Sequence, residues 1–287
     1  MSLTPDFGAT FIGWATGTTM ATVAAVCVRA VRRVYYSRPS AVIWGLGEDD
    51  GEYNLVLPAR FISEDVTKAP GWPWVPSGDA YAAALVVQTL RRLKKTVRVE
   101  IHAAGELPAE KRVRENLVCI GGPTFNEVTA DLMTALDVPL TYDDELSPGH
   151  PAMRSKSGAY FVSEVEVDQQ GWRVVKEDWG AVVVAQSPYL EASRSGKRVF
   201  LIMGNGSQGT FGAAKVLSVP DHQDVGSALM ELMPFVRSAH SRRSPVLYSR
   251  EICASLSARE KCAFLFRSRV EGGYVEYPYR GEEVQWY

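Results

Sequence analysis

A glycine-rich loop that follows an apolar run is the part of this sequence whose residue types and spacing most directly suggest chemistry. Residues 198–204 read RVFLIMG, and the loop GNGSQG (residues 204–209) leads into a helix-forming stretch. The order strand, G-x-G-x-x-G and helix is the dinucleotide-binding fingerprint, in which glycines bring a pyrophosphate close to a helix start. Three interpretations follow: a dinucleotide cofactor, another phosphate-bearing ligand, or a tight strand-to-helix turn without a ligand.

The residues after this loop favour a simple phosphate site over a dinucleotide cofactor. A dinucleotide-binding unit normally continues into a strand that ends in an acid for the ribose, whereas here PDHQD (residues 220–224) leads into a predicted helix at about 225–235. The P-loop pattern is also absent, because no lysine follows the last glycine directly. Ser207 is a conceivable nucleophile, but no histidine is assignable as its base. We therefore expect no cofactor and assign no catalytic residue.

A second strand, glycine loop and helix start lies earlier in the chain. The apolar run NLVCI (residues 116–120) leads into GGPTFNEVTADLMTAL, in which residues 124–127 read TFNE and fit a capping box with Thr124 as the cap. Because the carboxyl ends of parallel strands meet at one edge of a sheet, we expect both loops to line one crevice. The candidate ligand-binding residues there are Gly121, Gly122, Pro123, Asn126 and Thr129 in the first loop, and Gly204, Asn205, Gly206, Ser207, Gly209 and Thr210 in the second.

Basic residues in two segments are candidate phosphate partners for such a ligand. A helix is predicted from about Asp79 to Lys95, and four basic residues lie near its carboxyl end, where they either compensate the helix dipole or form an anion-facing patch. Another basic group lies in the loop RSAHSRRS. The candidates from these two segments are Arg91, Arg92, Arg242 and Arg243.

The N-terminal segment has the length and charge distribution of a membrane span. Residues 7–28 contain no charge, and at ~1.5 Å per residue they cover about 33 Å, enough for a hydrocarbon core of about 30 Å. Basic residues follow the span, which places the N-terminus outside and the rest in the cytoplasm by the positive-inside rule. A buried core helix and a cleaved signal are the alternatives. Residues 1–38 are thus predicted as a transmembrane helix with a juxtamembrane basic segment ended by Pro39, and residues 39–287 as a cytosolic domain.

Small and hydroxylated residues recur within this predicted span. A stripe of small residues at every fourth position lets neighbouring helices approach closely and favours self-association; it comprises Gly13, Gly17, Ala21 and Ala25. Threonine hydroxyls on the same segment either bond across helices or line a water-filled pore, which needs several copies of the chain. The pore-lining candidates are Thr16, Thr19 and Thr22.

Composition excludes several other classes of protein. The net charge of −2 over 287 residues argues against a general duplex-DNA-binding protein. The four cysteines form no C-x-x-C pair and the four histidines are scattered, so we expect neither a metal site nor a disulfide framework. Dispersed single cysteines fit a reducing compartment.

The order of the predicted elements indicates an α/β fold. Alternating apolar runs and helical patterns up to about residue 136 predict a mainly parallel sheet. From Gly158 onward the segments GAYFVSEVEV and GWRVVKEDWGAVVVAQ predict antiparallel strands joined by a DQQG turn, and Gly272-Gly273 predicts the turn of a terminal hairpin. The predicted fold class is a cytosolic α/β domain with a mainly parallel sheet and an antiparallel β-rich portion.

The segments CIGGPTFNEVT and LIMGNGSQGTFGAA together resemble a recurrent pair in prokaryotic α/β sensor-type domains. The signature positions of that resemblance are Gly121, Gly122, Pro123, Asn126, Thr129, Gly204, Gly209, Thr210 and Ala213. One membrane span followed by such a domain is similar to the membrane effectors of nucleotide-signalled anti-phage defence, in particular the oligonucleotide-gated channel component of Hailong systems.

This resemblance implies an oligomeric channel in the inner membrane whose cytosolic domain senses a nucleotide or short oligonucleotide. The implied partners are further copies of the chain, membrane lipid, the ligand and a signal-producing nucleotidyltransferase. A membrane-tethered nucleotide hydrolase or transferase, and an anchored scaffold whose glycine loops are purely structural, are the alternatives.

Overall fold

The computed structural model describes residues 38–46, 51–58, 60–61, 73–143, 152–218 and 245–286. The predicted membrane span, its small-residue and threonine positions, the predicted helix at 225–235, Arg242 and Arg243 all lie outside these ranges. Within the ranges, no helix is both long and apolar enough to cross a membrane.

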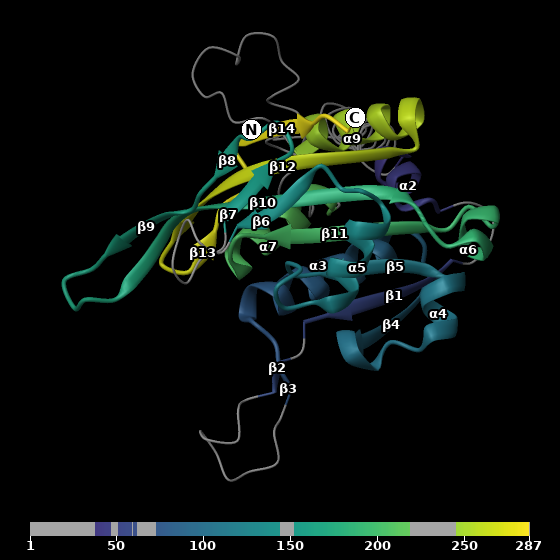
Figure 1. The fold of residues 1–287 in the computed structure, drawn as a ribbon, viewed down its shortest axis with the longest axis horizontal. Helices are drawn as coiled ribbons and strands as arrows, with labels where there is room; N and C mark the ends of the chain where they lie inside the picture. Colours follow the sequence, from purple (N-terminus) through teal and green to yellow (C-terminus); the bar gives the residue numbers. More distant parts are fainter. Residues whose placement is uncertain are drawn as a thin grey trace, which may run out of the picture.

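Among the described residues, nine strands form one mixed sheet at the centre of the fold (Figure 1). Its main path runs in the order β13 (Tyr274–Val275), β12 (Lys261–Glu271), β10 (Arg173–Gln186), β11 (Arg198–Gly204), β5 (Asn116–Ile120), β1 (Glu52–Leu57) and β4 (Arg98–Ala103). Two further strands pair outside this path, β9 (Glu164–Val167) with β10 and β14 (Arg280–Val284) with β12.

The sheet has a parallel half and an antiparallel half. Strands β11, β5, β1 and β4 are mutually parallel, whereas β10 runs antiparallel to both β11 and β12. An α/β fold with parallel strands first and antiparallel strands later is therefore confirmed, although the sheet as a whole is mixed. The β9–β10 turn and the β12–β13 hairpin lie where they were predicted, with left-handed backbone at Gly171, Gly272 and Gly273.

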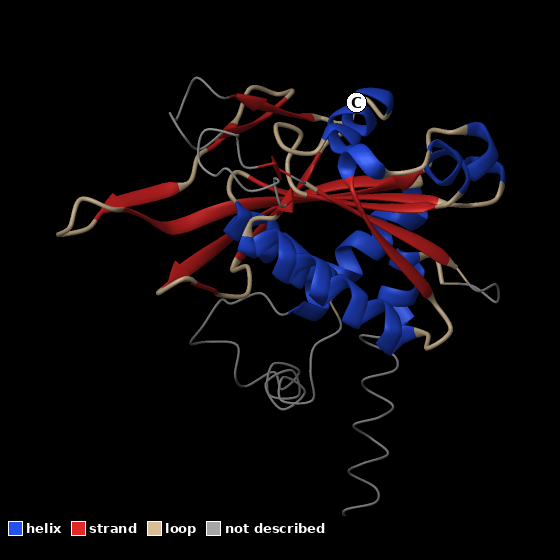
Figure 2. Cartoon of the chain, turned by 90° about the horizontal axis from the view of Figure 1, so that it is seen from below, coloured by secondary structure: helices blue, strands red, loops and turns tan. Residues whose placement is uncertain are grey.

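Helices cover both faces of this sheet (Figure 2). One face carries α2 (Arg38–Trp44), α3 (Ser77–Leu93), α7 (Ser207–Leu217) and α9 (Pro245–Arg259). The other carries the 3₁₀ turn η2 (Ala104–Glu106), α5 (Glu127–Ala135) and a three-stranded antiparallel sheet of β6 (Leu140–Asp143), β7 (Ala152–Ser155) and β8 (Tyr160–Phe161). The remaining elements are α4 (Ala109–Arg114), which packs on α6 (Leu190–Arg194), and a ribbon of β2 (Arg60–Phe61) and β3 (Pro73–Trp74).

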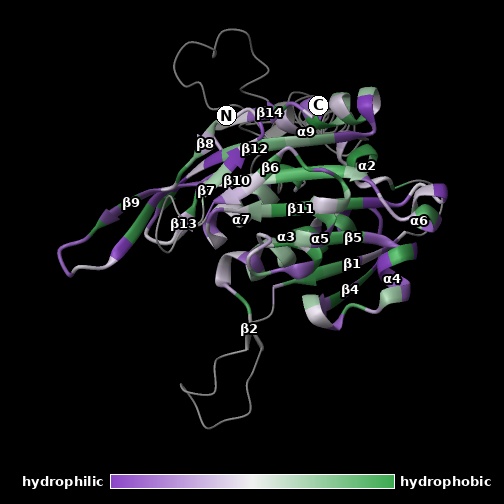
Figure 3. Cartoon of the chain, in the orientation of Figure 1, coloured by the Kyte–Doolittle hydropathy of each residue, from purple (hydrophilic) through white to green (hydrophobic). Residues whose placement is uncertain are grey.

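The distribution of hydrophobic residues along the chain explains why the strands form a sheet that is covered on both faces (Figure 3). In β5, Leu117 and Cys119 face one apolar cluster while Val118 and Ile120 face the other, because successive strand side chains point to opposite faces. A strand buried on both faces has to be a continuous apolar run. The predicted helix at 79–95 is confirmed as α3.

One predicted boundary is wrong. Pro39 was expected to end a helix, but α2 begins at Arg38 and Pro39 lies in its first turn. Proline is tolerated there because the first N–H groups of a helix have no acceptor within the helix. The apolar run 41–46, which follows it, is therefore mainly helical.

The connections change direction at the carboxyl ends of the parallel strands. Strands β1 and β11 are followed by α3 and α7 on one face, whereas β5, which lies between them, is followed by α5 on the other. Loops that leave neighbouring parallel strands toward opposite faces leave room between them, and this is where open α/β sheets bind ligands.

Candidate functional site

The two glycine loops lie side by side at this edge of the sheet. Strands β5 and β11 are parallel neighbours, and the Gly121 N–H donates to the Ile202 carbonyl oxygen at 2.9 Å. Gly121 has a φ of +93°, which is a left-handed conformation that favours glycine. The Tyr142 hydroxyl, which comes from the small sheet, donates to the Gly204 carbonyl oxygen at 3.2 Å. The prediction that the two glycine loops lie next to each other is therefore confirmed.

Asn126 and Thr129 brace the first loop. The Asn126 side-chain amide donates to the carbonyl oxygens of Val56 and Ile120, both at 3.0 Å, and its oxygen accepts from the Thr129 N–H at 3.2 Å. The Thr129 hydroxyl donates to the Gly121 carbonyl oxygen at 3.2 Å. Both side chains are fully buried. They hold the ends of β1 and β5 together, so their contribution to a ligand site is to shape the loop.

The predicted capping box is wrong. Helix α5 begins at Glu127 and its N-cap is Asn126, whereas Thr124 lies exposed in the preceding turn. Asparagine caps a helix as well as threonine does. Its side-chain NH₂ group also donates two hydrogen bonds, one to each of two strand ends. A threonine at this position has a single O–H donor and could not make both bonds.

Asn205 stabilises the second loop in the same way. Its amide nitrogen donates to the Phe161 carbonyl oxygen at 2.7 Å and its oxygen accepts from the Met153 N–H at 3.0 Å. These bonds tie the loop to the small antiparallel sheet. Gly209 is required by close packing, because a Cβ atom there would lie 2.1 Å from the Trp179 carbonyl oxygen.

Asp178 fills part of the anion site that the G-x-G-x-x-G pattern predicted. Its carboxylate, only 1% exposed, accepts from the Gly209 N–H at 2.6 Å, the Ser163 hydroxyl at 2.6 Å and the Trp179 N–H at 2.9 Å. A carboxylate at a helix N-terminus is stabilised by the helix dipole. The protein's own acid therefore occupies one donor of α7, and sequence analysis did not identify it.

The amino ends of α3 and α7 abut each other. A Cβ atom on Gly78 would lie 2.1 Å from the Ser207 carbonyl oxygen, so glycine is needed for this close approach. The N-cap residue of neither helix makes a side-chain bond, and the Asp178 carboxylate bonds the Gly209 N–H of α7. Within the described part of the chain, the N–H groups of Ser77, Gly78, Ser207 and Gln208 have no hydrogen-bond acceptor. Two uncapped helix starts side by side give a site of positive potential with several free donors.

Asp79 lies in the first turn of α3 and is the second residue that sequence analysis missed. Its side chain is 4% exposed, and its Oδ1 atom has no hydrogen-bond partner among the residues described. Burial raises the pKa of this carboxyl to about 6, while a hydrogen bond with the Thr210 hydroxyl opposes the rise. A buried acceptor without a donor is costly. This carboxyl lies next to the Gly121 loop.

The Tyr142 hydroxyl lies close to both acids. Burial, followed by the negative charges of Asp178 and Asp79, raises its pKa well above the ordinary value. The hydroxyl therefore stays protonated and remains a donor to the Gly204 carbonyl oxygen. This edge of the sheet thus combines N–H groups without an acceptor among the described residues, a protonated phenol and two buried acids.

Arg91 and Arg92 are not brought together with the glycine loops. They lie in the last turn of α3, whereas Asp79 lies in its first turn. Twelve residues of helix separate Asp79 from Arg91, a distance of about 18 Å. A phosphate held at the paired helix starts is therefore out of reach of these two arginines.

No protein-family model matches this chain, and no curated protein matches it significantly. Within the described ranges, no group of three or more histidine, cysteine or acidic residues is placed to hold a metal ion.

Proposed function

We propose that the α/β domain binds a nucleotide or short oligonucleotide at the crevice formed by the paired starts of α3 and α7 and the Gly121 loop. The observation that carries this proposal is the buried, unpartnered Oδ1 atom of Asp79 beside uncapped helix N-termini. The N–H groups suit phosphate oxygens, and the carboxylate suits a ligand hydroxyl or amino group. A nucleotide carries both kinds of group.

The acids make this site a poor one for inorganic phosphate. Asp79 lies in the first turn of α3, so a bare phosphate held at the paired helix starts would be repelled by its carboxylate, and Asp178 adds further negative charge at this edge of the sheet. A ligand whose phosphate and hydrogen-bond donors lie on different atoms avoids that repulsion. The site therefore favours a nucleotide over its phosphate alone.

Titration calorimetry on the full chain in detergent tests this binding. The probes are nucleoside mono- and triphosphates, short oligonucleotides and inorganic phosphate. Asp79→Asn replaces an acceptor oxygen by a donor and weakens nucleotide binding about 10- to 150-fold, which corresponds to a charge-assisted hydrogen bond of ~1.5–3 kcal/mol. Glu106→Gln is the matched control, because it makes the same chemical change on an exposed side chain. Equal affinities for Asp79→Asn and the unaltered chain, or no binding of any probe, would refute the proposal.

The output that we propose for this binding is a change in membrane permeability by an oligomer anchored through residues 7–28. Its support is the sequence pattern of that segment. Reconstitution in liposomes, with and without a nucleotide that the calorimetry identifies, tests this step. A ligand-dependent ion flux that Asp79→Asn abolishes supports gating, and the absence of any flux under both conditions refutes it.

One observation favours a membrane-tethered hydrolase or transferase as the second candidate. A carboxyl with a pKa of about 6 suits a general base near neutral pH, and Asp79 lies on the helix that abuts Ser207. Product formation from nucleoside phosphates that is lost in both Asp79→Asn and Ser207→Ala would favour this candidate over a sensor.

A further inference from the structure

Strand β4 ends the sheet on its parallel side. In the described part of the chain no strand pairs beyond it. Its Ile101 side chain is 58% exposed, which is unusual for isoleucine on a sheet face. A strand edge with free backbone groups and an exposed apolar side chain is a template for pairing with another chain.

An open apolar groove of about 860 Å³ runs along β4 on the side of α3. Three alanines of α3 form part of its wall, and Arg91, Arg92 and Lys95 lie at one end. The apolar lining consists of Leu57, Ala80, Ala83, Ala84, Val87 and Ile101. Small residues on an exposed helix face allow a second backbone to approach closely.

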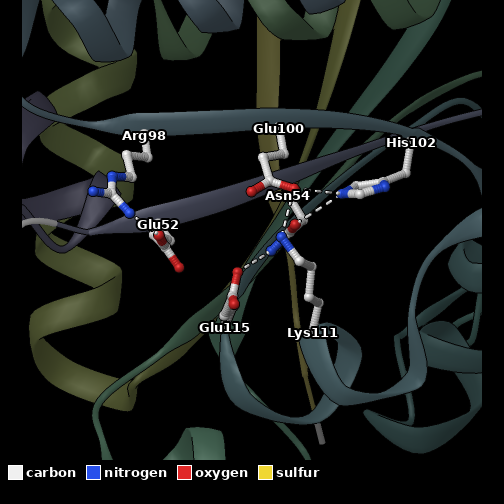
Figure 4. Close-up of polar contacts among 7 residues, drawn as sticks. All are labelled: Glu52, Asn54, Arg98, Glu100, His102, Lys111 and Glu115. Atoms are coloured by element: carbon white, nitrogen blue, oxygen red, sulfur yellow. Dashed lines mark hydrogen bonds and ion pairs between the residues drawn. The ribbon is translucent and has the colours of Figure 1, made fainter.

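The opposite face of β4 carries an ordered row of charges (Figure 4). Arg98 pairs with Glu52 at 3.1 Å, and Glu100 pairs with Lys111 at 2.5 Å and with His102 at 3.5 Å. Asn54, buried in β1, holds this row in place. It bonds the His102 ring at 3.0 Å and donates to Glu115 at 2.6 Å. Arg98, Glu100 and His102 thus lie in this order along one face of the edge strand.

We propose that two copies of this chain pair through their β4 strands, antiparallel about a two-fold axis at Ile101. Directly opposed residues in an antiparallel pair point to the same face of the sheet. In a symmetric pair the two-fold axis therefore lies where a residue opposes its own copy, and not midway between two residues. With the axis at Glu100, two carboxylates oppose each other. With the axis at Val99, Glu100 opposes Arg98, but the exposed Ile101 then opposes Val97, which is buried within its own copy. With the axis at Ile101, Glu100 of each copy opposes His102 of the other, and the isoleucines oppose each other. Charge and apolar character therefore select the Ile101 register.

This pairing also accounts for the groove. The second copy's edge covers the exposed Ile101 and places the two grooves on the same face of the joined sheet. The alanine walls of the two grooves then face each other, so apolar surface is removed from water on both copies. The groove extends along α3 from Ala80, which follows Asp79, to Arg92, so the proposed interface lies next to the proposed nucleotide site.

Cysteine cross-linking of the full chain in detergent tests the interface and its register. In a background with Cys27→Ser and Cys253→Ser, Ile101→Cys is expected to give an oxidised covalent dimer, because directly opposed Cβ atoms lie about 4.5–5.5 Å apart. Leu190→Cys is the control, since this aliphatic side chain is 64% exposed on α6. Mixed chains carrying Glu100→Cys and His102→Cys are expected to cross-link to each other more than either does alone. Equal cross-linking of Ile101→Cys and Leu190→Cys would overturn the proposal.

A charge placed on the axis gives an independent test. Adding Ile101→Lys to both members of the mixed pair brings two ammonium groups together and is expected to abolish the cross-link, whereas Leu190→Lys leaves it unchanged. Ile101 is exposed, so the substitution does not disturb the core, and nucleotide affinity measured on the same protein reports correct folding. A cross-link that persists in Ile101→Lys would contradict pairing through β4.

Discussion

Replacing Asp79 by asparagine is expected to stabilise the fold and to change how its stability depends on pH. Burial raises the pKa of this carboxyl from 3.8 to about 6 in the folded protein. The folded state therefore holds the proton more tightly than the unfolded chain does. The stabilisation of the fold that this bound proton contributes is fully present below pH 3.8 and is lost as the pH rises through 6. Above pH 6 the ionised carboxylate is a constant cost to the fold.

The size of this cost follows from the pKa change. At about 1.4 kcal/mol per pKa unit, the rise corresponds to about 3 kcal/mol in the free energy of unfolding. Because the unfolded carboxyl is already mostly ionised at pH 4.5, about 2 kcal/mol of it falls between pH 4.5 and 7.5. Asparagine does not titrate, so the free energy of unfolding of Asp79→Asn, relative to the unaltered chain, should rise by that amount over this interval.

Urea unfolding at pH 4.5 and 7.5 measures this difference. The exposed Glu106→Gln substitution is the control and should show no comparable gain. If the stability difference between Asp79→Asn and the unaltered chain is the same at both pH values within ~0.5 kcal/mol, burial does not act on this carboxyl as argued. A variant that is more stable at neutral pH and binds nucleotide less tightly shows that the acid is kept for its ligand at the expense of stability.

Two further substitutions test how the crevice is built, both by urea unfolding. Gly78→Ala forces a Cβ atom to within 2.1 Å of the Ser207 carbonyl oxygen and is expected to cost about 1–3 kcal/mol, whereas Gly105→Ala meets nothing closer than 3.7 Å and should be nearly neutral. Equal effects would show that α3 and α7 do not abut tightly. Asn126→Ala removes a helix cap and two buried donations and is expected to cost about 2–4 kcal/mol, but Thr124→Ala less than about 0.5 kcal/mol. A larger loss at Thr124 would restore the capping-box interpretation.

The parallel half of the fold was predictable from the sequence because its elements carry strong periodic signals. Strand β5 is apolar from Leu117 to Ile120, and α3 repeats its buried residues Ala82, Val86 and Leu90 at helical spacing. Parallel strands place their carboxyl ends at one edge, so the meeting of the two loops followed without any knowledge of side chains. The helix boundary at Pro39 failed because the same residue is common at helix starts and after helix ends.

The two acids of the crevice were not predictable by the same reasoning. Asp79 is one acid in the first turn of a helix, where acids are common for dipole reasons alone. Its burial depends on the Gly78 contact with α7, more than a hundred residues along the chain. Asp178 follows Lys176 and Glu177 in the polar first half of its strand, so nothing in the sequence distinguishes it from an exposed acid.

Asp178 also shows why a glycine fingerprint alone decides little about ligand binding. The pattern G-x-G-x-x-G specifies that backbone N–H groups are exposed at a helix start, but not which acceptor they meet. Here one of those groups meets a carboxylate 31 residues earlier in the chain, supplied by the neighbouring antiparallel strand. What stays open is the start of α7 next to α3, where the Ser207 and Gln208 N–H groups have no acceptor among the described residues and the Asp79 Oδ1 atom has no donor. The ligand site that we propose is thus shifted from the loop toward the junction of the two helices.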